Sequence, residues 1–470
     1  MIEVSLSWIA KNVNGTLYAQ GENGEDIIID RVNTDTRTIQ KGALFIALIG
    51  PNFNAHEFIQ RAEELGAAAL LVSKPVKTSL PYIYVEDTTV ALGELGAAVK
   101  AEVAPKTVGI TGSSGKTTVK EMVAAILEQR GKVLATKGNF NNEIGVPLTL
   151  LELQREHEFA VVEMGANHLG EIDYTASLAK PDVATIVNAS AAHLEGFGSL
   201  FGVARAKSEI YASLADEGLA VLNLDSQFYE YWAGKLDSDN AITFSTEKTA
   251  DYHATDVVLG IDGCAQFDMN TPQGKTNILL SLPGVHNVSN SLVAAALSMA
   301  VGASLENVKT GLQHLTQVKG RLNVKQLSNQ VRVLDDTYNA NVASVNAAID
   351  VLSSFSGYSV IILGDMGELG EKARYYHEKV GEYALQKGVS SFYSLGVLSQ
   401  SASDVFCKQG KHFSDLTELV EELSNELAGE HQDISILIKG SRSARMERVV
   451  AAIERSPVGK LERSRERIAC

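Results

Sequence analysis

The sequence predicts an α/β protein of three domains. The chain has 470 residues, short apolar strands alternate with amphipathic helices along most of it, and the alternation breaks twice. Such a length is too great for one hydrophobic core, since domains usually hold roughly 50 to 200 residues. We expect a small α/β domain over residues 1–84, a central domain built on a parallel sheet over 85–318, and a C-terminal domain over 319–470.

The first domain shows a simple pattern. "DTRTIQKGALFIALIG" and "AHEFIQRAEELGAAALLV" (residues 35–50 and 55–72) place short apolar strands around one amphipathic helix. Neither segment carries a catalytic signature of its own. We therefore expect a small α/β unit.

The other two domains repeat strand-then-helix units, which favour right-handed crossovers and a mostly parallel sheet. After the strand "KTVGI", a helix is expected to turn Met122, Ala125 and Ile126 inward. Further strands of the central domain are "FAVVEMG", "DVATIVNAS" and "LAVLNLD". Those of the last domain, which reads as Rossmann-like, are "VRVLDD", "YSVIILGD", "SSFYSLG" and "ISILIKG".

Polar residues gather where these strands end. In open parallel sheets, ligands bind outside the carboxyl ends of the strands. The central set is Ser113 to Thr118, Glu163, Asn188 and His193; the last domain adds Asp335, Asp336, Asp365, Ser441 and Arg442. We expect the two sheets to face each other across a cleft that brings these sets together.

The stretch "GITGSSGKTT" (residues 109–118) predicts a phosphate-binding loop, because it follows a strand and opens a helix. Gly112 and Gly115 let backbone N–H groups approach phosphate, and the helix N-terminus favours an anion. Lys116 is expected to reach the β- and γ-phosphates and Thr117 to ligate magnesium. Ser113, Ser114 and Thr118 complete the loop. Ile110 stands where the common pattern has glycine, and a surface turn is the alternative.

Charge and composition narrow the partners. A net charge of −16 argues against nucleic acid, which needs a cationic face. Cys264, Cys407 and Cys470 are far apart and read as reduced thiols. No apolar run approaches the roughly 18 residues of a membrane span, and the first residues do not resemble a secretion signal. We expect a cytoplasmic protein.

Three residues gain meaning only as a group. Glu163 ends an apolar strand, His193 lies in "NASAAHLEGFGS", and Lys207 lies in "GVARAKSEI" at a helix. Taken singly, they read as a surface carboxylate, a structural histidine and a solvated lysine.

Together with the loop, these residues carry a resemblance. "TGSSGKTT", "EMGANHLGEI", "NASAAHLEGFGSLFGVARAKSEI", "PGVHNVSNSLVAAA" and "VKGRL" fall in the order and spacing of the Mur ligases. These are ATP-dependent, amide-forming enzymes of peptidoglycan precursor synthesis. The resemblance covers all three domains and implies a UDP-binding first domain, a central P-loop ATPase domain and a C-terminal ligase domain.

The resemblance also implies roles. Thr117 and Glu163 would hold one magnesium ion and His193 a second, and Lys207 would carry CO₂ as a carbamate that ligates metal. Lys116, His193 and Lys207 would serve catalysis. The nucleotide contacts would be Asn287 and Asn290 to adenine, Arg321 to the phosphates and Asp336 to the ribose. In "DTR", Thr36 and Arg37 would bind the UDP end of the substrate.

The last domain indicates the substrate. "DDTYNANVASVNAAI", "LGDMGELG", "HEKVG" and "KGSRSARME" are similar to the family members that join D-alanyl-D-alanine to UDP-N-acetylmuramoyl-tripeptide. Val342 stands where that pattern has proline. We expect a monomer acting on these two substrates with ATP and two Mg²⁺ ions. The third residue of the tripeptide, diaminopimelate or lysine, stays open.

Other classes remain as alternatives. Another Mur ligase or a folylpolyglutamate-type ligase would share the central chemistry, although "DDTYNAN" speaks against the latter. A P-loop switch ATPase would hydrolyse ATP without amino substrates. In a non-catalytic nucleotide-binding scaffold, Lys207 and His193 would have no role.

Overall fold

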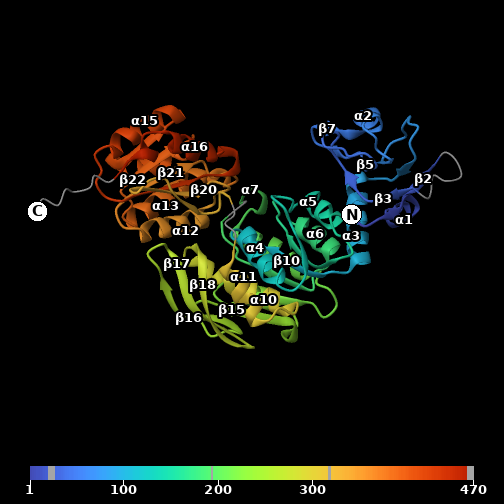
Figure 1. Cartoon of the computed structure of the whole chain (residues 1–470), viewed down its shortest axis with the longest axis horizontal. Coiled ribbons are helices and arrows are strands. Elements are labelled where there is room, and N and C mark those ends of the chain that lie inside the picture. The colour runs from blue at the N-terminus through green and yellow to red at the C-terminus, as the bar shows by residue number, and fades with distance from the viewer. Residues whose placement is uncertain (20–26, 192–193, 316–318, 463–470) are drawn as a thin grey trace, which may run out of the picture.

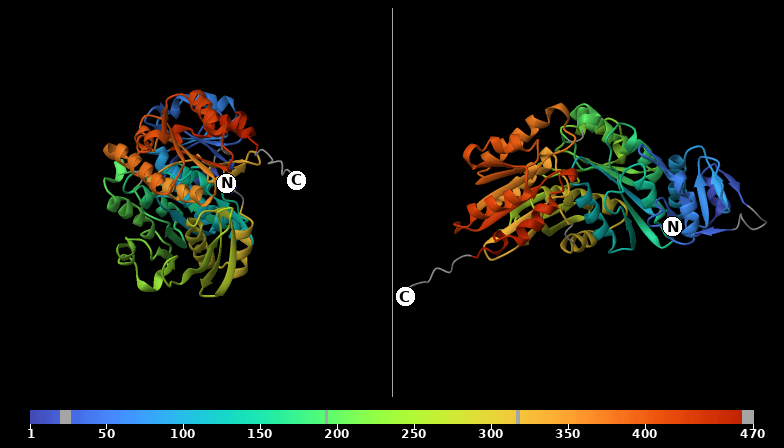
Figure 2. Two further views of the ribbon diagram at one scale, coloured as in Figure 1. Left: turned by 90° about the vertical axis from the view of Figure 1, so that its left-hand side faces the viewer. Right: turned by 90° about the horizontal axis from the view of Figure 1, so that it is seen from above.

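The protein is an α/β protein whose three domains follow one another in a row, as the computed structural model shows (Figure 1). The structure describes residues 1–19, 27–191, 194–315 and 319–462. The N-terminal and C-terminal domains lie on opposite sides of the central one, and the view from above shows the same order (Figure 2). The predicted fold class is confirmed, and we retain 84/85 and 318/319 as proposed domain bounds.

The first domain holds a small mixed sheet in the order β2-β9-β8-β5-β4. Strands β4, β5, β8 and β9 run parallel and β2 closes one edge antiparallel to β9. Its strands are β1 (Val4–Ser5), β2 (Thr16–Tyr18), β3 (Ile28–Ile29), β4 (Val32–Asn33), β5 (Leu44–Ile46), β6 (Ile49–Gly50), β7 (Phe53–Asn54), β8 (Ala69–Val72) and β9 (Tyr82–Tyr84). Its helices are α1 (Leu6–Asn12) and α2 (Ile59–Glu64).

The central sheet has the order β11-β12-β10-β13-β14-β15-β16-β17-β18. Its strands are β10 (Lys106–Thr111), β11 (Lys132–Ala135), β12 (His157–Glu163), β13 (Val183–Ile186), β14 (Leu219–Asn223), β15 (Ala241–Ser245), β16 (Tyr252–Leu259), β17 (Cys264–Thr271) and β18 (Gly274–Pro283). The strands from β11 to β16 are parallel, as predicted. The sequence analysis missed the antiparallel extension through β17 and β18. Its predicted strands were short apolar runs, whereas β17 and β18 alternate apolar and polar residues.

Helices cover both faces of the central sheet. The helices are α3 (Thr88–Val103), α4 (Lys116–Leu127), α5 (Gly145–Leu151), α6 (Glu171–Ala179), α7 (Leu194–Phe197), α8 (Leu200–Lys207), α9 (Tyr229–Ala233), α10 (His286–Ala300) and α11 (Leu305–Gln313). Helices α4, α10 and α11 pack on one face. Met122 and Ile126 on α4 are fully buried, as predicted, whereas Ala125 is only half-buried.

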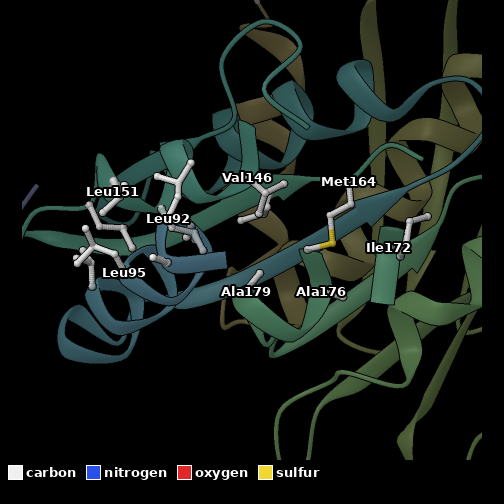
Figure 3. Packing of buried hydrophobic residues seen from close by; sticks show 14 of the residues in the cluster. Leu92, Leu95, Val146, Leu151, Met164, Ile172, Ala176 and Ala179 are labelled. Atoms are coloured by element: carbon white, nitrogen blue, oxygen red, sulfur yellow. The ribbon is translucent and has the colours of Figure 1, made fainter. Parts of the chain in front are cut away.

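The opposite face of this sheet belongs to a core shared with the first domain. Leu92 and Leu95 from α3 meet Val146 and Leu151 from α5, and the cluster continues to Ile172 on α6 (Figure 3). The same cluster includes residues of α1 and of strands in the first domain. Because α3 directly follows that domain, this packing fixes the first domain on the central one.

The C-terminal domain holds a sheet in the order β19-β20-β24-β21-β22-β23, parallel except for β19. Its strands are β19 (Asn323–Gln326), β20 (Val331–Asp336), β21 (Tyr358–Gly364), β22 (Ser391–Leu395), β23 (Gly410–Phe413) and β24 (Ile434–Lys439). Its helices are α12 (Val342–Ser354), α13 (Ala373–Gln386), α14 (Gln400–Asp404), α15 (Leu416–Leu427) and α16 (Glu447–Arg455). Helices on both faces explain the near-continuous apolar strands.

Truncation of Leu95 tests the shared core. Leu95 is fully buried, so Leu95→Ala loses transfer free energy and leaves a cavity, a cost of about 2–5 kcal/mol. We expect the thermal unfolding midpoint to fall by about 5–15 °C. Val90→Ala on the same helix, where Val90 is 48 % exposed, should change it little. Equal midpoints for the two variants would contradict the assigned packing.

Candidate functional site

The glycine loop joins β10 to α4, as predicted. Gly115 has φ +79°, and a Cβ there would lie 3.0 Å from Asn290 Oδ1, so both conformation and space require glycine. Asn188, at the end of β13, accepts hydrogen bonds from Ser114 N at 3.0 Å and Ser114 Oγ at 3.2 Å. Ser113 N donates to Asn188 O. The loop is therefore held from the neighbouring strand.

Lys116 begins α4 and points back over the loop. Its Nζ donates to Gly112 O at 2.8 Å. Burial lowers the pKa of Lys116, although the Glu163 carboxylate acts in the opposite direction. The cation therefore sits in the loop that would surround a phosphate, close to one carboxylate.

Thr117, in the first turn of α4, and Glu163, at the end of β12, are the residues predicted to bind one magnesium ion, and their side chains lie in contact. Thr117 Oγ1 donates to Glu163 Oε2 at 3.0 Å, and Glu163 is 3 % exposed. Asn141 Nδ2 donates to Glu163 Oε1 at 2.8 Å and orients the carboxylate. Sequence reasoning missed Asn141, whose only signal was its place in the asparagine-rich "NFNNE".

Lys207 lies in the last turn of α8 and is 2 % exposed, which is unusual for lysine. Burial, and then the nearby charge of Lys116, set its pKa well below the usual value. In the described part of the chain, no carboxylate or carbonyl accepts a hydrogen bond from its Nζ. The environment of Lys207 therefore disfavours the charged form of its amine. His193, predicted as its companion, lies outside the described residues.

A cavity of about 210 Å³ lies between the loop and the C-terminal domain. We call it the asparagine cavity, because Asn287 and Asn290 line it from α10, both nearly buried. Asn290 Nδ2 donates to Asn287 Oδ1 at 2.9 Å and Asn287 Nδ2 donates to Pro283 O at 2.8 Å. Pro283 and Ala347 add apolar wall, so the cavity combines flat apolar surface with amide groups.

Asp336, predicted to meet a ribose, lines the same cavity but is already paired. Lys439 Nζ donates to Asp336 Oδ2, and Leu322 N donates to Asp336 Oδ1. Burial lowers the pKa of Lys439 despite this partner. The sequence analysis did not single out Lys439, although a lysine that ends the apolar strand "ISILIK" was a usable signal.

A second, larger cavity of about 770 Å³ lies on the other side of the loop. We call it the lysine cavity, because Lys116, Lys207 and Lys319 line it together with Glu163. Arg321 lines both cavities. Its Nη2 donates to Thr117 Oγ1 at 3.2 Å, and its guanidinium lies over the Tyr338 ring. Arg321 thus connects the C-terminal domain to the loop, beside the predicted phosphate position.

The two cavities lie where the cleft between the sheets was predicted, but they bring together only part of the predicted polar sets, since Asp365 and Ser441 line neither cavity. Asn341 Nδ2, at the start of α12, donates to Ser113 O at 3.1 Å, which joins the two domains at the loop. Ser441 and Asp365 make contacts within their own domain instead. Asp365 accepts hydrogen bonds from the backbone N–H groups of Val397, Leu398 and Ser399, and Ser441 N donates to Asp365 O. Arg442 reaches the lysine cavity.

The residues predicted for UDP lie apart from both cavities. Thr36 is half-buried and Arg37 is exposed, in the turn after β4. Arg37 Nη2 contacts Asp35 Oδ2 at 2.6 Å, an exposed pair. This places a cationic group on the first domain, at the far end of the molecule from the C-terminal domain (Figure 1).

Two further observations limit the site. Among the residues that the structure describes, no set of three or more His, Cys, Asp and Glu side chains is arranged to bind a metal ion. A metal here would need threonine, phosphate or water oxygens besides Glu163. In the same residues, no helix has the length and apolar character to span a membrane.

Comparison with known protein families decides the relationship. The Mur ligase middle domain matches residues 110–298, the glutamate ligase domain of Mur ligases matches 320–442, and the Mur ligase catalytic domain matches 28–129. The chain belongs to the Mur ligase family. The predicted family is thereby confirmed, and this Mur ligase is an enzyme of the ligase class.

The sequence similarity between this Mur ligase and its relatives covers nearly the whole chain. The UDP-N-acetylmuramoyl-tripeptide--D-alanyl-D-alanine ligase of Escherichia coli (strain K12) is 48 % identical, over 97 % of this chain and 99 % of its own. The enzyme of the same name from Bacillus subtilis is 34 % identical, over 97 % and 100 %.

Solved structures agree with this relationship. MurF from Acinetobacter baumannii superposes with a TM-score of 0.91 at 36 % identity, covering 96 % of this chain and 99 % of its own. MurF from Thermotoga maritima, in complex with ADP, has a TM-score of 0.81 at 28 % identity, covering 92 % and 98 %. A folylpolyglutamate synthase from Mycobacterium tuberculosis, at 16 % identity, shares the fold alone.

The buried Lys439–Asp336 pair gives a stability prediction. Lys439→Met leaves the Asp336 carboxylate buried without its cation, which should cost about 3–5 kcal/mol. The double variant Lys439→Met with Asp336→Asn removes both charges and should recover most of the loss. Thermal unfolding of the three proteins measures this difference. A double variant less stable than Lys439→Met alone would contradict the pairing.

Proposed function

We propose that the protein joins D-alanyl-D-alanine to the peptide carboxylate of UDP-N-acetylmuramoyl-tripeptide and cleaves ATP to ADP and phosphate. The full-length similarity to ligases of that name supports this activity. So does the ADP complex of the related Thermotoga maritima MurF, which indicates nucleotide binding in this fold.

One observation carries the proposal: the phosphate loop lies between two cavities of different character. The asparagine cavity has the amide groups and apolar wall that suit a purine. The lysine cavity is larger and polar, which suits a peptide chain. A γ-phosphate in the loop would stand between nucleotide and peptide, where a carboxylate could attack it.

The chemistry then follows from the groups at that border. The tripeptide carboxylate attacks the γ-phosphorus, and the bond from that phosphorus to the β-phosphate breaks. ADP departs, and the peptide now carries an acyl phosphate. The amine of D-alanyl-D-alanine attacks the acyl carbon, the tetrahedral intermediate collapses, and phosphate leaves with formation of the amide. Lys116 and Arg321 stabilise the negative charge on the transferring group, where most catalysis of such steps lies.

Thr117 and Glu163 fit a Mg²⁺ ion bound together with phosphate. Their side-chain oxygens are 3.0 Å apart at the loop, and Mg²⁺ is usually held by one or two carboxylates plus substrate phosphates. When bound, the metal would neutralise phosphate charge. We propose Thr117 and Glu163 as ligands of one ion, with His193 and Lys207 for a second.

Lys207 fits a carbamate. A neutral buried amine is a nucleophile, and its attack on CO₂ forms a carbamate and releases a proton. The product is an anion beside the Lys116 cation, and the two groups attract each other. The carbamate would also supply oxygen atoms for the second metal ion.

We propose that Thr36 and Arg37 contact the UDP end of the substrate. The first and last domains lie at opposite ends of the molecule, which suits a substrate with a nucleotide at one end and a peptide at the other (Figure 1). The exposed Arg37 guanidinium offers charge to a diphosphate. We further propose that the enzyme acts in the cytoplasm, since ATP is its energy source. We also propose that it acts as a monomer.

The proposed activity is tested by ADP release and by the mass of the sugar-nucleotide product. ADP should appear only when tripeptide and D-alanyl-D-alanine are both present, and bicarbonate should increase the rate. The product should gain one dipeptide. Each candidate amino substrate is assayed in turn, with ATP and the tripeptide present. ADP release with neither peptide substrate would favour a simple ATPase, and coupling of a different acceptor would refute the assignment.

Removal of the loop cation should nearly abolish turnover. Loss of one such electrostatic contact costs on the order of 3 kcal/mol, about a hundredfold or more in rate. We expect kcat of Lys116→Ala to fall at least that far while its unfolding midpoint stays unchanged. Lys132→Ala, at an exposed ion pair on β11, is the matched control and should keep full activity. Near-normal kcat in Lys116→Ala would remove the loop from the mechanism.

A further inference from the structure

The loop between β24 and α16 is fixed against the end of the C-terminal sheet. Ser441 N donates to Asp365 O at 2.9 Å, Ala444 N donates to Ser441 O at 3.0 Å, and Met446 is fully buried. The side chain of Met446 packs closely against the backbone at Gly440, where a Cβ would lie 2.6 Å from Met446 Cγ. Packing within the domain therefore sets the position of this loop.

Arg442 projects from this loop to line the lysine cavity. Its Nη1 donates to Glu447 Oε1 at 3.1 Å, and its side chain is 65 % exposed. The pair uses only one oxygen, since Glu447 Oε2 has no hydrogen-bond partner in the described part of the chain. Glu447 thus orients the guanidinium without engaging it in a bidentate pair, and the other donors face no protein acceptor there.

The other cations of the lysine cavity have different places. Lys116 and Arg321 contact the phosphate loop, and Lys207 is buried. Lys319 also lines this cavity and stands two residues before Arg321 in the sequence. Arg442 differs from Lys116 and Arg321 in that its described hydrogen bond is to Glu447 and not to the phosphate loop.

Arg442 lines the same cavity as Lys116 of the phosphate loop. The loop after β20 touches the phosphate loop through Asn341, and β24 is the next strand in the sheet. Arg442 follows β24, and its described hydrogen bond is to Glu447 and not to the phosphate loop. An extended dipeptide spans about 7 Å between its ends, and a single amino acid about half of that.

We propose that Arg442, oriented by Glu447, binds the free carboxylate of the incoming D-alanyl-D-alanine. This inference rests on the proposed function and names the residue that selects the acceptor. The planar guanidinium matches a carboxylate with two parallel hydrogen bonds. With the carboxylate held there, the amine at the other end reaches toward the phosphate loop, where the activated carbonyl stands.

The test compares two acceptors, D-alanyl-D-alanine and its C-terminal amide, in wild type and Arg442→Gln. Loss of one charge-assisted contact should raise the KM for the acid about 10- to 100-fold. The KM values for ATP and for UDP-N-acetylmuramoyl-tripeptide should not change. Wild type should prefer the acid to the amide by a similar factor, and Arg442→Gln should use both equally. Arg442→Lys keeps the charge without the planar fork and should fall between.

Controls separate the outcomes. Arg445→Gln, three residues along the same loop and exposed, should behave as wild type. An Arg442→Gln enzyme that still prefers the acid, or a preference lost instead in Lys319→Gln, would overturn the inference. If Arg442→Gln does not fold, an unchanged acid preference in Arg442→Lys has the same force. A wild type that couples neither acceptor would refute the proposed function instead.

Discussion

The structure depends on keeping the phosphate loop open to an anion while two domains close on it. The hydrogen bonds from the loop to Asn188 hold it from the side of its own sheet. Asn341 and Arg321 reach it from the C-terminal domain. Because both sheets present the carboxyl ends of their strands, polar residues of both domains meet at the loop, where we propose that nucleotide and peptide react.

Burial lowers the pKa of three lysines around the phosphate loop. Lys116, Lys207 and Lys439 all have a lowered pKa, and burial is the first cause for each. Their surroundings differ: Lys439 has the Asp336 carboxylate, Lys116 lies near Glu163, and Lys207 has no anion among the described residues. Lys439 therefore serves the structure, and we propose that Lys116 binds phosphate and that Lys207 is modified.

Much of this arrangement could be predicted from the sequence. Apolar strands that end in polar residues revealed the parallel sheets and brought Thr117 and Glu163 to one edge. Three-dimensional partners were harder. Asn141 comes from a loop without periodicity, and β17 and β18 carry the alternation of strands with one exposed face. The pairing of Asp336 with Lys439 joins residues 103 positions apart, which no local pattern reveals.

Transfer of phosphate to the peptide carboxylate is the central claim, and an isotope label tests it most directly. The tripeptide substrate is prepared with ¹⁸O in its terminal carboxylate, and the phosphate released during one round of coupling is analysed by mass. If the carboxylate attacks the γ-phosphorus, one ¹⁸O atom appears in the phosphate. Release of unlabelled phosphate alongside the coupled product would contradict the account.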